Sequence, residues 1–401
     1  MKEARMTVFN HSLIWFGAAI SIAEILTGAL LAPLGFSRAL GAIVLGHLIG
    51  GVFMYLSGLI GARTGLSAME TVKGAFGSRG GLLFAALNVL QLVGWTAVMI
   101  HSGAAAAASL FPAAAWVWCA AIAALIGLWV ALGVGGAFRL NVVAMAALFV
   151  LSALLSKVVF GGGGVATPPP GAMTFGTGVE LSVVMPLSWL PLISDYTRHA
   201  TRRPRAVTFA GVAVYGLASC WMYVIGLGAS TLTGESDVAR ILAAAGFGSA
   251  ALLIVLGSTV TTTFLDVYSA GVASASIVPK LDERKVAALV CLAGAALAAF
   301  TPITRYESFL YFISSVFAPM AAVLVVDYFV FASPGAKRRF NLGNLAVWTA
   351  GFILYRALLV RGVETPVGLT VPVMAATAVL ALIAGSISAS AYGTYERTRI
   401  R

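Results

Sequence analysis

The chain has 401 residues, of which 60% are hydrophobic and only 10% are charged, with a formal net charge of +11. This composition excludes a soluble globular protein, and no polar stretch is long enough for a separate soluble domain. Apolar runs that reach the ~20 residues needed to cross a bilayer recur along the chain. Because backbone groups in lipid must bond within their own segment, the runs are expected to be helices. We predict an all-α polytopic membrane protein with a single integral-membrane domain over residues 1–401.

The positive charge does not indicate nucleic-acid binding, because the basic residues lie in short loops between the apolar runs. Of the 25 Lys and Arg residues, 19 fall on one side of the predicted membrane and 6 on the other. An excess of basic residues marks the cytoplasmic side of a multi-pass protein. The sequence therefore predicts that both termini are cytoplasmic and that the protein lies in the cell inner (plasma) membrane.

Twelve apolar runs are predicted as transmembrane helices. Their expected limits are residues 13–33, 40–62, 82–110, 114–133, 140–160, 176–195, 206–230, 248–278, 286–304, 308–332, 343–360 and 367–391. A loop rich in glycine and proline, residues 161–171, separates span five from span six. It is either an ordinary flexible loop or the boundary between two repeats. Five spans on each side would suit an inverted repeat, in which the first span of each repeat is broken.

Spans one and six carry the features of broken helices. Span one holds an acid, Glu24, between Gly17 and Gly28. This acid either faces a cavity or forms a structural pair with a polar group elsewhere. Span six holds Pro186, which removes a backbone donor at mid-membrane depth. Pro186 marks either unwound backbone that lines a cavity or a simple kink.

Span three places an amide and an aromatic ring on one helical face, since Gln91 and Trp95 are four residues apart. A ring surface beside an amide suits a flat heterocycle, which stacks and also needs directional hydrogen bonds. The alternative is that Trp95 only fills the core. His47 in span two is interpreted as a satisfied interior group rather than a proton relay. Gly46 and Gly50 predict close helix packing.

Span eight contains hydroxyl residues followed by an acid, from Ser258 through Thr261 and Thr262 to Asp266. Thr262 and Asp266 are four residues apart and share one helical face. This face could offer hydroxyl oxygens to a small cation and a carboxylate to a polar ligand. The alternative for the threonines is hydrogen bonding to their own helix or to a neighbouring helix.

The chain resembles the nucleobase-cation-symport-1 family over most of its length. The resemblance rests on Pro191–Arg198 at the end of span six, on the threonine-rich stretch before Tyr268–Gly271, and on Gln91 with Gly94 and Trp95. Within the family the chain looks most like hydroxymethylpyrimidine permeases of the CytX type, which are associated with salvage of thiamine precursors. The resemblance implies a LeuT-like 5+5 inverted repeat with repeat one over about 13–160 and repeat two over about 176–332. It also implies two extra C-terminal helices over about 343–391.

The resemblance also implies a substrate site at the midplane, among spans one, three, six and eight. The substrate-binding residues expected there are Glu24, Gln91, Trp95, Met185, Pro186, Ser188 and Asp266. A cation site is expected at Gly17 and Ser21 in the break of span one, with Thr261 and Thr262 of span eight. The break in span six is expected to lack the aromatic residue that several relatives place there, which leaves only one ring for stacking. Asp266 stands where cytosine and hydantoin carriers tend to have asparagine.

These residues lead to the hypothesis of a secondary active importer of hydroxymethylpyrimidine that works by cation symport and alternating access. The coupling ion is expected to be Na+, with H+ as the alternative because two acids lie within the spans. An alternative substrate is cytosine, a purine or another nucleobase. An intramembrane enzyme is disfavoured, because the histidines are scattered and the cysteines unpaired. A passive channel is the other rival. No cofactor, nucleic acid or obligate protein partner is expected beside the small-molecule substrate and the lipid bilayer.

Overall fold

The computed structural model describes residues 7–136, 138–161, 173–200, 202–233, 248–300, 306–331 and 338–399. Within these ranges the regular structure is helical, and a helix lies at each of the twelve predicted spans. The helices are α1 (Val8–Ala19) with α2 (Ile22–Leu30), α3 (Phe36–Thr64), α5 (Gly80–Leu110), α6 (Ala115–Gly136), α7 (Phe138–Gly161), α8 (Phe175–Ser188) with α9 (Ile193–Thr197), α10 (Pro204–Thr233), α12 (Gly248–Ile277), α13 (Glu283–Phe300), α14 (Tyr306–Val326), α15 (Leu342–Val360) and α16 (Thr370–Arg399). Three shorter elements are η1 (Ala32–Leu34), α4 (Ala68–Phe76) and a π-helical turn, η3 (Asp327–Phe331).

The fold is that of a multi-pass membrane protein. Among the described residues, eight helices are long and apolar enough to cross a membrane, and the bent pair at the N-terminus makes a ninth. The remaining predicted spans correspond to α7, α12 and α13. Most of the loop predicted as a repeat boundary, residues 161–171, lies outside the described residues.

Span one is broken between α1 and α2, which meet at an angle of 51°. The α1 hydrogen bonding ends at Ile20, whose N–H bonds the Phe16 carbonyl. The chain then extends through Ser21, whose hydroxyl accepts a hydrogen bond from the Glu24 N–H and so caps α2. Serine is a favoured N-cap residue because its oxygen satisfies a free donor of the first turn. The break therefore has a local cause in the sequence.

Span six is broken between α8 and α9. α8 ends at Ser188, two residues after Pro186, and tight turns follow through Trp189 and Leu192 before α9 begins. A proline inside a helix removes one hydrogen bond and clashes with the preceding turn, and Pro191 adds a second interruption. The two breaks lie in spans one and six, the positions that an inverted repeat predicts.

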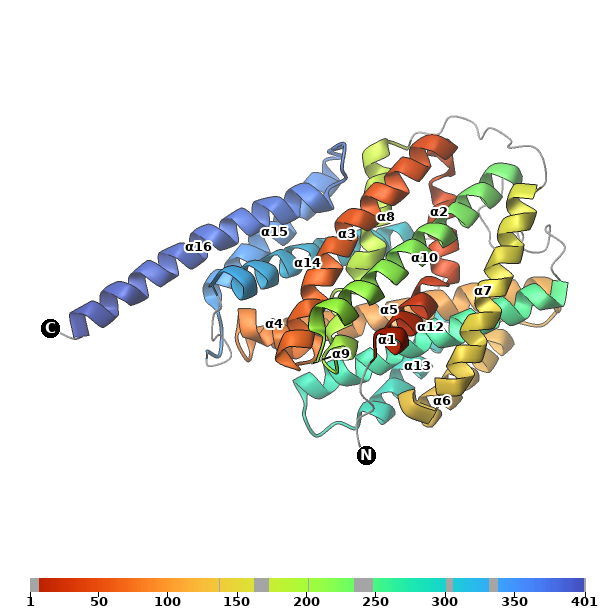
Figure 1. Cartoon of the computed structure of the whole chain (residues 1–401), viewed down its shortest axis with the longest axis horizontal. Coiled ribbons are helices and arrows are strands. Elements are labelled where there is room, and N and C mark those ends of the chain that lie inside the picture. The colour runs from red at the N-terminus through yellow and green to blue at the C-terminus, as the bar shows by residue number, and fades with distance from the viewer. Residues whose placement is uncertain are drawn as a thin grey trace.

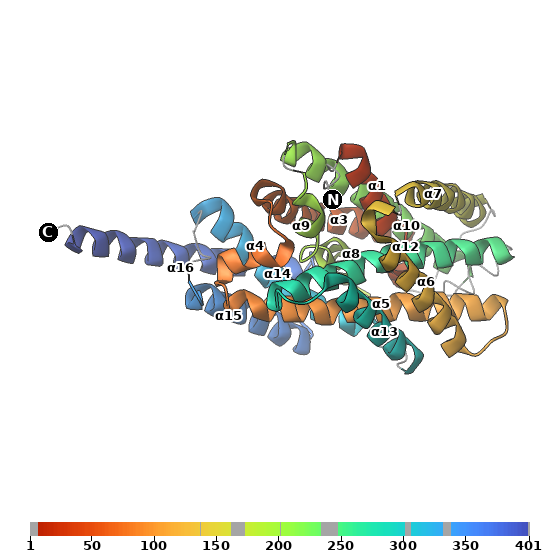
Figure 2. The same cartoon turned by 90° about the horizontal axis from the view of Figure 1, so that it is seen from below.

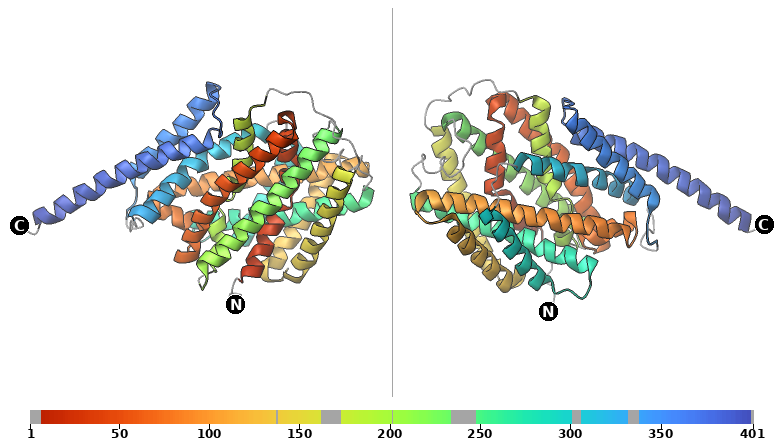
Figure 3. Two further views of the ribbon diagram at one scale, coloured as in Figure 1. Left: turned by 45° about the horizontal axis from the view of Figure 1, so that its top comes forward. Right: turned by 180° about the vertical axis from the view of Figure 1, so that it is seen from behind.

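Two groups of helices make up most of the molecule. The first group is α1, α2, α3, α8, α9 and α10, and the second is α5, α6, α12 and α13; each packs mainly on its own members. Figure 2 shows α5 and α13 on the opposite side of the molecule from α3 and α9. The view from behind in Figure 3 shows α5 running across the second group. α14, α15 and α16 pack together beside the two groups, at the left of Figure 1.

The glycines of α3 allow α8 to approach closely, as the sequence predicts. A Cβ atom at Gly46 would overlap Ser182, and one at Gly50 would overlap Pro186. Glycine pairs at this spacing let membrane helices pack backbone to backbone. The first half of span six, α8, therefore packs closely against span two.

Candidate substrate site

A small pocket lies between the two helix groups. The first group contributes residues of both breaks, namely Ala18, Ser21, Ala23, Glu24, Met185, Ser188 and Trp189. The second group contributes Trp95, Met99, Thr262 and Asp266. The pocket therefore combines spans one, three, six and eight, the four that the sequence predicts for a substrate site.

Asp266 brings a carboxylate into this pocket from α12. Its side chain is only 4% exposed, and no hydrogen bond from a described residue reaches the carboxylate. A charged group at membrane depth costs about 2.5–3.5 kcal/mol even on a mild insertion scale. Such a group is normally paired or hydrogen-bonded. The Asp266 carboxylate is thus an acceptor that is available to a ligand.

Glu24, the second pocket acid, is held by the protein itself. Tyr215 of α10 donates a hydrogen bond to one carboxylate oxygen at 2.9 Å, and Ser219 lies 2.8 Å from the other. The Ser219 hydroxyl also lies 2.6 Å from Nε2 of His47, whose Nδ1 lies 2.8 Å from the Ile43 carbonyl. The two acids therefore differ in kind, because Glu24 belongs to a polar network and Asp266 does not.

Two tryptophan rings line the pocket, one from each helix group. Trp95 of α5 packs edge-to-face on Phe309, with ring centroids 5.4 Å apart. Trp189 lies in the turn that follows α8, and its indole N–H donates to the Tyr215 hydroxyl at 3.1 Å. The expectation that the break in span six lacks an aromatic residue is wrong, because Trp189 lies one residue beyond Ser188 and lines the pocket. A flat ligand can meet aromatic surface from both groups.

Gln91 and Pro186 do not line the pocket but shape its wall. The Gln91 amide donates to Asn88 at 3.0 Å and to the Ser188 carbonyl at 3.2 Å, while Asn88 donates to the Pro191 carbonyl. These bonds satisfy carbonyls that the break in span six frees. The Gln91 oxygen is buried and has no partner among the described residues. Pro186 packs against Gly50.

The predicted cation ligands are only partly brought together. The Thr262 hydroxyl lies 3.2 Å from the Gly17 carbonyl, and Ser21 lines the pocket beside them. Thr261 instead directs its hydroxyl toward the Gly257 and Ser258 carbonyls of its own helix, at 3.0 and 3.1 Å. This back-bonding is the alternative that the sequence left open for the threonines.

Residues 2–380 match the family described as "Permease for cytosine/purines, uracil, thiamine, allantoin". The cytosine permease of Escherichia coli K12 is 25% identical over 334 residues, covering 82% of this chain and 79% of the relative. A putative purine-cytosine permease of Bacillus subtilis 168, YxlA, is 24% identical over 354 residues, covering 79% of this chain and 74% of the relative.

Solved transporter structures share the fold. Mhp1, a nucleobase-cation-symport-1 family transporter solved in a closed conformation with bromovinylhydantoin bound, superposes with a TM-score of 0.78 at 18% identity, covering 96% of this chain and 93% of its own. A Na+-coupled sialic acid symporter superposes with a TM-score of 0.68 at 15% identity, covering 96% and 90%. The LeuT-like architecture is therefore confirmed. The chain belongs to the cytosine, purine, uracil, thiamine and allantoin permeases, the nucleobase-cation-symport-1 family, and is a transporter rather than an enzyme.

Proposed function

We propose that the protein is a secondary active importer of 4-amino-5-hydroxymethyl-2-methylpyrimidine, a thiamine precursor, and that a cation enters with it. The observation that carries this proposal is the buried Asp266 carboxylate, which has no hydrogen-bond partner among the described residues and lies in a pocket with Trp95 and Trp189. A carboxylate only accepts hydrogen bonds, so it favours a ligand that presents donors. The exocyclic amine of an aminopyrimidine, or its protonated ring nitrogen, supplies them.

The other pocket residues fit a small flat ring. Trp95 and Trp189 offer stacking surfaces, while Met185 and Ser188 close the wall at the break in span six. Gln91 acts on the ligand through the Ser188 carbonyl, which it holds in place. Glu24 supports the pocket rather than clamping the amine, because Tyr215 and Ser219 already bind its two oxygens.

We propose Na+ as the coupling ion, held near Gly17 and Thr262. The Thr262 hydroxyl and the Gly17 carbonyl already face each other across the two helix groups. Ser21 borders the same place, and Thr261 would have to turn its hydroxyl away from its own helix to join them. An ion that ties α1 to α12 favours the conformation in which these helices meet. Coupling follows only if the ion binds one conformation better than the other.

Proton coupling is a second candidate, and the network around Glu24 favours it. The three contacts from Ile43 through His47 and Ser219 to Glu24 each need one hydrogen. A neutral histidine supplies one and serine supplies another. The third hydrogen must be an extra proton, carried by the carboxyl of Glu24 or by a charged His47. The network therefore has the composition of a proton-binding site beside the pocket.

The alternative substrate is a nucleobase, which would make the protein a nucleobase permease. Cytosine also carries an exocyclic amine on a flat ring, so Asp266 and the two tryptophans would accept it. The relatives named as cytosine permeases favour this alternative. We also place both termini in the cytoplasm and the protein in the inner membrane, on the basis of the loop charges.

A thermal-shift panel on the purified protein separates these alternatives. Hydroxymethylpyrimidine, cytosine, uracil, allantoin and thiamine are each tested in sodium and in choline. A ligand that binds only the folded state raises the unfolding temperature by mass action. A shift with hydroxymethylpyrimidine that grows with sodium supports both parts of the proposal. A shift with cytosine alone overturns the substrate, and a shift that follows pH but ignores sodium overturns the ion.

A further inference from the structure

The segment Ser194–Thr197, which forms most of α9, makes hydrogen bonds to neighbouring helices that the substrate site does not explain. Two of its hydroxyls fasten it to α3 within the first helix group. The Ser194 hydroxyl donates to the Ser57 carbonyl at 2.9 Å, and the Thr197 hydroxyl donates to the Gly58 carbonyl at 2.7 Å. The second half of span six, α9, is therefore fixed to span two and moves with it.

Tyr196, between these two residues, makes the opposite kind of contact. Its hydroxyl donates to the Leu265 carbonyl at 3.0 Å and accepts from the Ser269 hydroxyl at 3.3 Å. Both partners belong to α12 of the second group, and Leu265 directly precedes Asp266. The Tyr196 side chain is only 3% exposed. The tyrosine thus joins the two groups at the helical turn that carries the pocket carboxylate.

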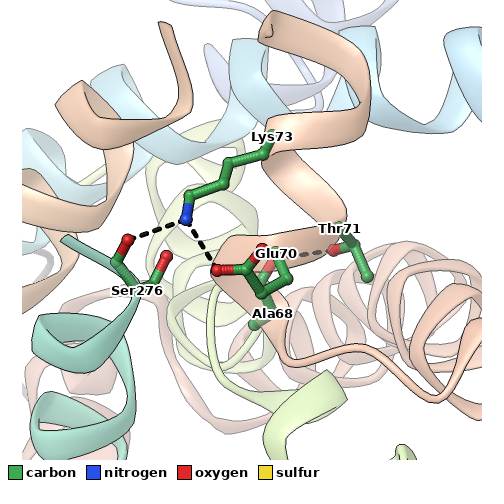
Figure 4. A network of polar contacts seen from close by, with 5 residues as sticks. All are labelled: Ala68, Glu70, Thr71, Lys73 and Ser276. Carbon is green, nitrogen blue, oxygen red and sulfur yellow. Dashed lines mark hydrogen bonds and ion pairs between the residues drawn. The ribbon is translucent and has the colours of Figure 1, made fainter. Parts of the chain in front are cut away.

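A second connection runs from α9 to the end of α12 through α4. Asp195 accepts a hydrogen bond at 2.9 Å from the N–H of Ala68, the first residue of α4. One turn on, Lys73 donates to the Ser276 carbonyl at 2.7 Å and to Glu70 at 2.6 Å, as Figure 4 shows. Ser276 lies in the last turn of α12, where carbonyls lack helical partners and a cation is favourable.

Figure 1 shows α4 and α9 at the end of the molecule where α1 begins, so both connections lie at this end. Span six runs from the pocket at Ser188 to α9, and α12 runs from Asp266 to Ser276. The two helices can separate on this side only if the Tyr196 bonds break and the connection through α4 opens, either between Asp195 and Ala68 or between Lys73 and Ser276. Breaking the Tyr196 bonds also releases the turn that holds Asp266.

We propose that Tyr196 and Lys73 form a latch that closes the N-terminal exit of the pocket, and that Tyr196 is a positioning residue for Asp266. The latch holds the substrate-binding turn in place while the exit is shut, and it opens as substrate leaves. Calling this exit cytoplasmic rests on the proposed orientation. The latch itself requires only that a transporter exposes its pocket to the two sides in turn.

The test compares two substitutions that each remove one hydroxyl from α9. Tyr196→Phe removes the contact between the groups, whereas Thr197→Val removes a contact within the first group. The reporter is a single cysteine, Val272→Cys, in a chain whose three native cysteines are replaced. Val272 is 4% exposed and lies three residues after Ser269 and four before Ser276, on their face of α12. Its reaction with a membrane-impermeant thiol reagent is timed in vesicles of known orientation.

We expect Tyr196→Phe to speed labelling from the N-terminal side by about tenfold, since one hydrogen bond of typical strength changes an equilibrium by roughly that factor. Thr197→Val should label at the parent rate. Lys73→Met tests the second connection and serves if Tyr196→Phe fails to fold. Equal labelling rates for Tyr196→Phe and Thr197→Val, or for Lys73→Met and the parent, would overturn the latch.

Labelling does not depend on which pyrimidine is carried, so failure of the latch and failure of the proposed substrate are distinguishable. A second readout tests positioning. If the thermal-shift panel yields a ligand, Tyr196→Phe should weaken its binding and Thr197→Val should not. Equal binding by the two variants would leave Tyr196 with no positioning effect on Asp266 and would overturn that part of the inference.

Discussion

The Thr262 hydroxyl lies 3.2 Å from the Gly17 carbonyl and connects the hydroxyl-rich α12 to the end of α1. Gly17 lies in the last turn of α1, where carbonyls have lost their helical partners because the helix breaks. One side of this contact belongs to the first helix group and the other side to the second. A cation coordinated by both oxygens, in place of the hydrogen bond between them, would therefore act on the relative position of the two groups.

Replacing Thr262 by valine tests this arrangement. Thr262→Val keeps the side-chain shape and removes the oxygen, so the sodium concentration for half-maximal uptake should rise by about tenfold, the factor that ~1.4 kcal/mol of lost binding produces. Uptake in vesicles across a sodium series measures the change. Thr263→Val is the matched control, because Thr263 is buried next door and lies outside the pocket lining. A sodium dependence that is the same in both variants would remove Thr262 from the ion site.

Replacing Asp266 by asparagine tests the ligand acceptor. Asp266→Asn keeps the size of the side chain and turns part of the acceptor into a donor. Since a hydrogen bond to a charged group is worth about 1.5–3 kcal/mol, pyrimidine affinity should fall by roughly 10- to 100-fold. Isothermal titration or thermal shift measures the affinity, and the same variant is tested with uracil, which lacks the amine. Unchanged pyrimidine binding would contradict the assignment of Asp266.

Trp189 is expected to contribute a stacking surface. Stacking of a base on an aromatic side chain is worth about 1–3 kcal/mol, so Trp189→Leu should weaken binding by about tenfold or more. Trp189→Phe should lose less, because it keeps a ring and gives up only the bond to Tyr215. Trp348→Leu on α15 is the control, since that ring packs on Phe84 and Phe352 away from the pocket. Equal affinities for Trp189→Leu and Trp348→Leu would mean that Trp189 does not touch the ligand.

Local features allowed the breaks and one face of α12 to be predicted. Pro186 acts on its own helix, and Thr262 and Asp266 lie one turn apart on any helix. The break in span one was predicted from Glu24 between two glycines, whereas the capping role of Ser21 was not predicted. The place of Trp189 was missed because it depends on how far the chain unwinds after the proline. α4 was missed because nine residues are too few to span a bilayer.

Contacts between distant helices could not be predicted from one sequence. Tyr215 and Ser219, which bind Glu24, lie more than 190 residues further along the chain. Gln91 shares a helical face with Trp95 but lies about 6 Å from it along the axis of α5, toward the N-terminus of that helix, since each residue rises 1.5 Å. At that level the neighbour is the turn after α8 rather than the pocket. A shared face therefore predicts direction, whereas depth depends on the packing of other spans.

Glu180 of α8 is a buried acid in span six for which the sequence analysis predicted no role. It is only 2% exposed, and it accepts hydrogen bonds from the Tyr355 hydroxyl, from the Thr370 N–H at 2.8 Å and from the Thr370 hydroxyl. Thr370 begins α16, so the carboxylate caps that helix, where negative charge is favourable. One side chain thus connects both extra helices to α8, the first half of the broken span.

Replacing Glu180 by glutamine should destabilise the protein without changing substrate binding. An amide presents its NH2 group to at least one of the donors, and a buried donor left without an acceptor costs about 1–3 kcal/mol. Thermal unfolding of the purified protein measures the loss, with Glu364→Gln in the exposed loop between α15 and α16 as the control. If both variants unfolded at the parent temperature, Glu180 would not stabilise the packing of α15 and α16 on α8. If Glu180→Gln instead altered ligand affinity, the extra helices would act on the pocket through α8 and would influence substrate binding as well as stability.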